Sequence, residues 1–131
     1  MKIEYQDYQA LKMQLVTHQA EILTVLKAFI SEKRFEILIQ LLDGPKSFQA
    51  LLDSVHLQKT ALAHHLSSLQ EVFLIEKPGY GSYKIHQDGA KYLETIYNTW
   101  LQSLSVQKLR MARQEQRGLS PHFINAFFQK E

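Results

Sequence analysis

Cysteine is absent from the 131-residue sequence. A disulfide framework, a thiolate metal site and a cysteine nucleophile are therefore excluded, which agrees with a protein of the reducing cytoplasm. Glycine and proline are scarce, with five and three residues, and this scarcity argues against disorder and against a β architecture with many turns. Because 45% of the residues are hydrophobic, the chain can nevertheless bury a core, and we expect helix to dominate.

Long apolar runs are also lacking. No uninterrupted stretch approaches the ~18 residues that a membrane span requires. Near the start, Glu4, Asp7 and Lys12 interrupt the apolar residues, so that we expect neither a signal peptide nor a membrane partner. Neither sign of charge is in large excess. The net charge is only +2, which gives a weak overall field for attracting a polyanion.

Catalytic motifs are missing too. The stretch at 78–82, PGYGS, lacks the glycine spacing and the following lysine of a phosphate-binding loop, and no Gly-x-Ser-x-Gly nucleophile motif occurs. The acidic residues are scattered over expected turns and helix ends rather than paired on one face. We therefore expect a protein that is not an enzyme and that needs no cofactor.

Apolar residues recur at intervals of three and four along most of the chain, which predicts amphipathic helices. A long helix is expected over 3–30. Ser31 can cap a second helix that stops at 43–45, and Ser47 can cap a short third helix. A fourth helix is expected over 58–73.

The period of the apolar residues changes after the fourth helix. Residues 74–77 and 82–86 flank a glycine-rich turn, which predicts a two-stranded β-hairpin supported by the helices. A last long helix is expected over 88–117. Ser120 and Pro121 then form a good cap for a short closing helix.

This order of elements predicts a winged helix-turn-helix: a mainly α fold with a small β-hairpin wing, whose second paired helix is offered to a DNA major groove. We expect a single domain over 1–131, with a dimerisation helix at 1–30, the helix-turn-helix and wing at 31–87, and dimerisation helices at 88–131. The apolar stripes on the long terminal helices exceed what a small domain can cover, which implies a partner surface.

The fourth helix has two contrasting faces. At about 100° per residue, Leu62, Leu66, Leu69 and Phe73 fall within one arc, while Thr60, His64 and Ser67 lie on the opposite side. The outward face is small and polar, so that hydroxyl and imidazole groups can meet base edges or phosphates.

The adjacent histidines of this helix do not form a metal site. His64 points outward and His65 sits on the flank of the leucine arc, so the two side chains diverge and cannot chelate one ion. For His65 we expect a half-buried side chain bonded to a backbone carbonyl. His64 is either a nucleic-acid contact or simply exposed.

With these residues identified, the stretch KTALAHHLSSLQEVFLIEK followed by YKIHQDGAKYLE resembles the ArsR-type winged-helix transcription regulators of bacteria and archaea. The resemblance covers roughly residues 31–100. It implies a homodimeric repressor or sensor whose first and last helices build the dimer interface. It also implies that DNA is read by Lys59, Thr60, Ala63, His64 and Ser67, with Lys77, Tyr80 and Lys84 on the wing.

The sequence departs from the family pattern at several positions. Gln58 stands where a serine or threonine normally caps the recognition helix, and Ala63 takes a place often held by a polar residue. Phe73 stands where the family tends to end this helix with glycine, so we expect the helix to run on or to close differently. The cysteine ligands of metal-sensing members are absent, as is any histidine between Asp88 and Arg117, and no metal is expected.

Two hypotheses follow. The first is a homodimeric DNA-binding transcription regulator. The rival is a winged-helix module that binds another protein and not DNA, and the near-neutral charge over 31–107 favours this rival. A small apolar effector between the aromatic terminal helices is a further alternative, although aromatic stripes at helical spacing are more often core or interface.

The candidate DNA-contacting residues are Lys46, Gln58, Lys59, Thr60, Ala63, His64, Ser67, Lys77, Tyr80 and Lys84. The candidate dimer-interface residues are Tyr8, Leu11, Leu15, Tyr97, Trp100 and Leu104.

Overall fold

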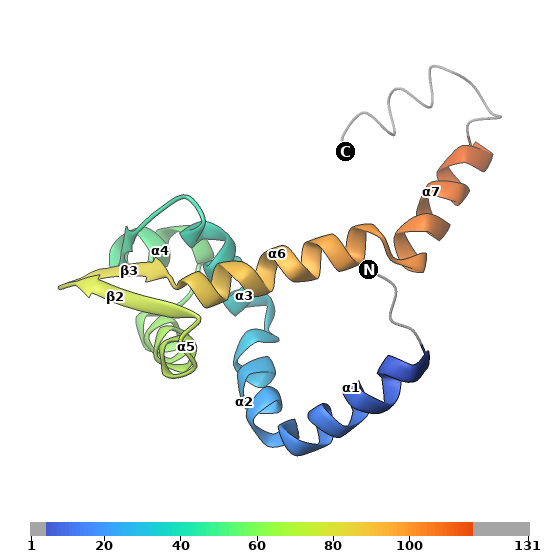
Figure 1. Ribbon diagram of the computed structural model, residues 1–131. Coiled ribbons are helices and arrows are strands. Elements are labelled where there is room, and N and C mark those ends of the chain that lie inside the picture. The colour runs from blue at the N-terminus through green and yellow to red at the C-terminus, as the bar shows by residue number, and fades with distance from the viewer. Residues whose placement is uncertain (1–4, 117–131) are drawn as a thin grey trace. The chain divides into compact units, whose positions relative to one another are not determined.

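A computed structural model of the protein describes residues 5–116, and the closing helix expected after Ser120 lies outside this range. The chain divides into two compact units, Met1–Ala90 and Lys91–Glu131. The first unit contains the helix-turn-helix and the sheet (Figure 1). The expected fold class, a mainly α winged helix-turn-helix, is confirmed. No helix within 5–116 has both the length and the apolar character needed to cross a bilayer.

The N-terminal segment forms two helices, α1 (Tyr5–Thr17) and α2 (Gln19–Phe29), so the single helix expected over 3–30 is wrong. The break falls at His18, whose backbone has φ −111° and ψ 17°. One residue earlier, the Thr17 hydroxyl donates to the Met13 carbonyl at 2.8 Å, a local bond that competes with the helical ladder and bends helices. Apolar periodicity continues through this point and therefore conceals the break.

The helix-turn-helix consists of α3 (Glu32–Leu41), α4 (Phe48–Val55) and α5 (Lys59–Glu71). As expected, Ser31 and Ser47 cap α3 and α4, because their hydroxyls accept from the backbone N–H groups three residues on, at 3.4 and 3.1 Å. The turn between α4 and α5 passes through His56 in the left-handed conformation (φ 53°). Gln58 occupies the cap position of α5 without a side-chain capping bond.

The wing belongs to a three-stranded antiparallel sheet of order β1-β3-β2, not to the two-stranded hairpin that the sequence predicted. The strands β2 (Ile75–Gly79) and β3 (Ser82–Ile85) form the hairpin. The third strand, β1 (Lys46–Ser47), pairs with β3. Two residues are too short to produce a sequence pattern, which is why β1 was missed.

The core of the first unit is made by the inner faces of α3, α4, α5 and the first residues of the wing. Its largest fully buried side chains are Ile37, Leu38, Leu41, Leu51, Val55, Leu62, Leu66, Leu69, Leu74 and Ile75. The three leucines of α5 are at most 1% exposed. Full burial of a leucine contributes about 1.5–3 kcal/mol relative to exposure, so these residues fix which side of α5 faces inward.

Helix α5 ends in a Schellman motif centred on Phe73. The Leu74 N–H donates to the Leu69 carbonyl at 3.0 Å, and the Phe73 N–H donates to the Gln70 carbonyl at 3.1 Å. Phe73 adopts the left-handed conformation (φ 61°) that normally selects glycine. The expectation that Phe73 avoids this conformation is wrong. Phe73 also does not belong to the buried leucine face of α5, because its side chain is 65% exposed.

The C-terminal segment forms α6 (Gln87–Leu101) and α7 (Leu104–Gln116), so the continuous helix expected over 88–117 is wrong within the described residues. Ser103 separates the two helices: its hydroxyl lies 2.6 Å from the Trp100 carbonyl and 3.4 Å from the Val106 N–H. A serine that bonds to nearby backbone in this way favours a helix end and a new cap over a continuous helix.

Candidate nucleic-acid interface

The outward face of α5 forms a narrow polar surface. We call Lys59, Thr60, Ala63, His64 and Ser67 the α5 ridge. All five residues are exposed, whereas Leu62, Leu66 and Leu69 on the opposite side are buried. Gln58, just before the helix, occupies its cap position. The structure therefore brings six of the candidate DNA-contacting residues onto one helix face and its N-terminal end.

The wing carries three further candidate residues. Tyr80 lies between Gly79 and Gly81 at the tip of the hairpin, and its side chain is fully exposed. The Lys77 ammonium lies 5.2 Å from the centre of the Tyr83 ring, a cation–π contact that steadies the lysine without neutralising it. In contrast, Lys84 lies 3.7 Å from a Glu76 carboxylate oxygen, so its charge is offset.

The candidate lysines differ in how free their charges are. Lys46, on β1, lies 3.8 Å from Asp43, and its side chain is only 25% exposed. No ion pair involves Lys59 or Lys77 within residues 5–116. These two lysines are therefore the best-placed positive charges of the first unit for phosphates beside α5 and the wing, which lie side by side in Figure 1.

His65 is half-buried, as expected, but its partner is not a backbone carbonyl. Its Nδ1 accepts a hydrogen bond of 3.0 Å from Nε of Arg34 on α3. Burial, the Arg34 guanidinium and the neighbouring His64 lower the pKa of His65 below 6.5, so the imidazole stays neutral at neutral pH. With its Nδ1 accepting, the neutral ring carries its proton on Nε2.

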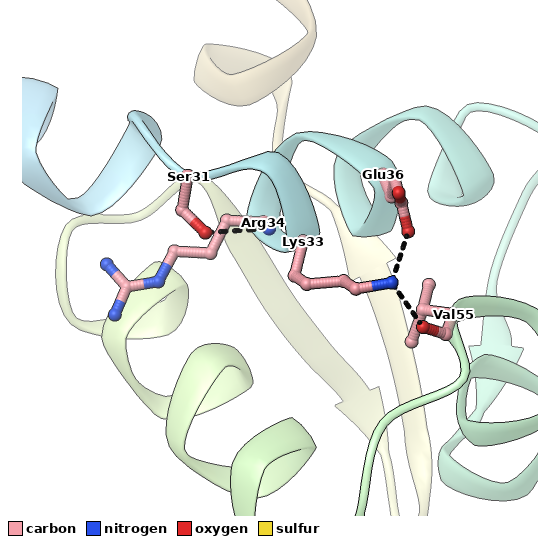
Figure 2. A network of polar contacts seen from close by, with 5 residues as sticks. All are labelled: Ser31, Lys33, Arg34, Glu36 and Val55. Atoms are coloured by element: carbon pink, nitrogen blue, oxygen red, sulfur yellow. Dashed lines mark hydrogen bonds and ion pairs between the residues drawn. The ribbon is translucent and has the colours of Figure 1, made fainter.

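Sequence reasoning missed Arg34. One signal was present: Arg34 lies in the first turn of α3, where a positive charge opposes the helix dipole, so its guanidinium needs partners elsewhere. Figure 2 shows Arg34 and Lys33 leaving this turn in different directions. Lys33 donates to the Val55 carbonyl at the end of α4 at 3.0 Å and lies 3.4 Å from Glu36.

The N-terminal helices carry an apolar groove. Its volume is about 490 Å³, and it is lined by Tyr8, Leu11, Lys12, Leu15, Val16, Gln19, Ile22 and Leu23. Three of the candidate dimer-interface residues lie here and are 41–50% exposed. The other three, Tyr97, Trp100 and Leu104, belong to the second unit and are 49–62% exposed.

Metal ligands are not grouped in the part of the chain that the structure describes: no cluster of three or more histidine, cysteine, aspartate or glutamate side chains there could hold an ion. His64 and His65 have ring centres 6.0 Å apart with ring planes inclined at 51°.

A helix-turn-helix with an exposed polar second helix and a β-hairpin wing defines the winged helix-turn-helix class. Residues 31–77, from the cap of α3 into β2, match the sequence model of the family described as bacterial regulatory protein, arsR family. The resemblance to ArsR-type regulators is therefore confirmed. No curated protein sequence matches the chain.

Solved structures show the same fold. Reduced HlyU from Vibrio cholerae is 27% identical, with a TM-score of 0.53, and the match covers 63% of this chain and 90% of HlyU. The transcriptional repressor BigR from Xylella fastidiosa is 18% identical, with a TM-score of 0.56 and coverage of 66% and 93%. Mb0332 from Mycobacterium bovis, a homodimeric winged helix-turn-helix DNA-binding domain, is 22% identical, with a TM-score of 0.52 and coverage of 75% and 87%.

Proposed function

We propose that this protein is a cytoplasmic, homodimeric transcription regulator that inserts α5 into the major groove of DNA. The observation that carries the proposal is the division of α5 into a fully buried leucine face and the exposed α5 ridge. The arsR family match over α3, α4 and α5 supports the same role. A repressor among the structures of the same fold makes repression the mode we favour. No catalytic role is proposed.

The residues of the α5 ridge suit a groove because they are small or carry hydrogen-bonding tips. Thr60, His64 and Ser67 can donate to or accept from base edges and phosphates, and Ala63 lets the helix approach closely. Tyr80 at the wing tip contacts the backbone or the minor groove beside the same site. Lys59 and Lys77, whose charges are not offset by a carboxylate in the described chain, supply the phosphate contacts.

Dimerisation accounts for the exposed apolar surface of α1 and α2. Monomeric proteins rarely leave a continuous apolar groove such as that around Leu11 and Leu15 open to water. A second copy of the chain, joined through the candidate interface residues of both units, covers such surface. Two copies of α5 then read half-sites about 34 Å apart, or a multiple of that. A small apolar effector would compete for the same groove.

The experiment measures binding to a duplex selected by the protein from a random pool, over a series of salt concentrations. Each phosphate contact contributes about 0.9 to the slope of log affinity against log salt. Replacing both Lys59 and Lys77 with glutamate removes two contacts per protomer and should reduce the slope of the dimer by about 3–4. Lys108→Glu, on the exposed face of α7, serves as the matched control. An unchanged slope in the double variant removes these lysines from the interface.

The rival function, a winged-helix module that binds another protein, is favoured by one specific observation. Lys46 and Lys84 each lie within 4 Å of a carboxylate, which reduces the positive charge around the wing. A folded wild-type protein that retains no duplex DNA, even at low salt, would favour this function over the regulator.

A further inference from the structure

Arg34 links three helices of the first unit. Its Nε donates to His65 Nδ1 on α5 at 3.0 Å, and its Nη1 donates to the Ala28 carbonyl at 3.1 Å and the Lys27 carbonyl at 3.5 Å. The side chain therefore starts on α3, satisfies the end of α2 and holds α5.

The end of α2 needs this arginine. The last carbonyls of a helix have no partner within the helix. In α2, the Leu26 carbonyl accepts from the Ile30 N–H and the Phe29 carbonyl from the Ser31 N–H. The carbonyls between them, those of Lys27 and Ala28, accept from Arg34. A cation at a helix C-terminus also interacts favourably with the helix dipole, so the guanidinium is held firmly at this place.

The contact with His65 restrains the rotation of α5 in addition to the buried leucines. His65 follows His64 of the α5 ridge directly, and neighbouring side chains on a helix are separated by about 100°. A ring held at Nδ1 by a fixed guanidinium therefore restrains the direction in which Thr60, His64 and Ser67 face. The buried leucines fix which side of α5 faces inward, and the hydrogen bond, whose strength depends on its angle, adds a directional restraint on the flank of the helix.

We propose, on the basis of the proposed function, that Arg34 is a positioning residue for DNA recognition: it acts through neutral His65 to hold the α5 ridge in the orientation that reads sequence. Arg34 touches no DNA in this scheme. Its loss weakens binding to a selected duplex much more than binding to an unrelated one, because non-specific binding depends on phosphate charge and not on the alignment of base contacts.

Protonation of His65 breaks the link. An imidazolium carries a proton on Nδ1, so a second donor and a second positive charge would meet the Arg34 guanidinium. The elements packed against α5 are α2, α3 and β2. Their charged or titratable side chains are Glu21, Lys27, Glu32, Lys33, Arg34, Glu36, Glu76 and Lys77, and α5 itself adds Lys59, His64 and Glu71. Of these groups, Arg34 and His64 act on the pKa of His65, and both lower it. Sequence-specific affinity should therefore fall as the solution becomes acidic.

The test compares wild type with Arg34→Met and His65→Asn on two probes: a 30-base-pair duplex selected by the wild type, and a scrambled duplex of the same composition. Asparagine places an acceptor oxygen near the position of Nδ1 and does not titrate, so H65N keeps the bond with Arg34 and rescues it at low pH. R34M preserves length and removes every donor. Circular dichroism and the melting temperature show that each variant is folded at the assay temperature.

At about pH 8, where His65 is neutral, R34M should lose about tenfold in affinity for the selected duplex, with less than about a twofold change on the scrambled one. Between about pH 8 and pH 5.5, the ratio of the two affinities should fall in the wild type and stay constant in H65N. His64 is present in both proteins, so the comparison isolates the effect of His65.

Equal losses on both probes in folded R34M, or identical pH profiles for wild type and H65N, would overturn the positioning role while leaving the proposed function intact. A wild type that selects no duplex at all would overturn both. These outcomes separate the failure of the positioning role from the failure of DNA binding.

Discussion

Gly89 lies at the junction between the wing and α6, and its replacement gives a sharp test of the packing there. A Cβ atom added at Gly89 would overlap the Leu74 carbonyl oxygen and would also press on the Ile85 side chain at 3.2 Å. The Leu74 carbonyl cannot move freely, because it accepts from the His86 N–H at 3.0 Å and belongs to the residue that closes the Schellman motif of α5. Gly89→Ala must therefore displace backbone.

The expected cost follows from two opposing effects. Overpacking costs about 1–3 kcal/mol, and displacing backbone belongs at the upper end of that range. Alanine is favoured over glycine within a helix by about 1 kcal/mol, which leaves a net loss of about 2 kcal/mol. For a unit of this size, such a loss lowers the melting temperature by about 8–16 °C.

The assay is thermal unfolding followed by circular dichroism, with Gly79→Ala as the matched control. Gly79 has no atom within 4 Å of an added Cβ, and its φ is not in the left-handed region. The control should therefore melt within a few degrees of the wild type. A Gly89→Ala protein as stable as the control would refute the close approach of α6 to Leu74.

Three further predictions concern the helices that carry the interface. Leu66→Ala should lower the free energy of unfolding by about 2–5 kcal/mol in urea denaturation, because the side chain is 1% exposed, whereas Ser67→Ala, on the outward face, should change it little. Ser47→Ala should cost about 1 kcal/mol through the lost cap of α4, and an unchanged midpoint would contradict that role. The folded state lowers the pKa of His65 below 6.5, so the unfolded chain binds the proton first as the pH falls. The contribution of His65 to the free energy of unfolding is therefore complete above pH 6.5 and is lost as the pH falls below that value. His65→Asn should flatten this part of a stability profile against pH, and a profile with unchanged slope would mean that another group causes the loss.

The sequence predicted those features that depend on periodic burial. Leucines at 62, 66 and 69 recur every three or four residues, and this spacing alone predicts which side of α5 is buried. Ser31 and Ser47 precede apolar helical runs, and both act as caps. The α5 ridge could be predicted for the same reason, because it is what remains when the apolar side of a helix is buried.

Other features depend on contacts that a periodic pattern does not contain. The ends of α1 and α6 coincide with bonds from the hydroxyls of Thr17 and Ser103 to nearby carbonyls, and the apolar pattern continues past both residues. Phe73 adopts an unfavourable backbone conformation because burial of Leu69 and Leu74 on either side of the motif outweighs its cost. The bond between Arg34 and His65 joins residues 31 positions apart.

The most direct test of the central claim is affinity cleavage of bound DNA. The chain has no cysteine, so a single introduced thiol can carry an iron chelate at one chosen position. Ser67→Cys places the chelate on the α5 ridge, and Gln9→Cys places it on the exposed surface of α1 as a control. The proposed function predicts cleavage within the bound site from position 67 and none from position 9. Protein bound to DNA without cleavage from position 67 would contradict the insertion of α5 into the groove.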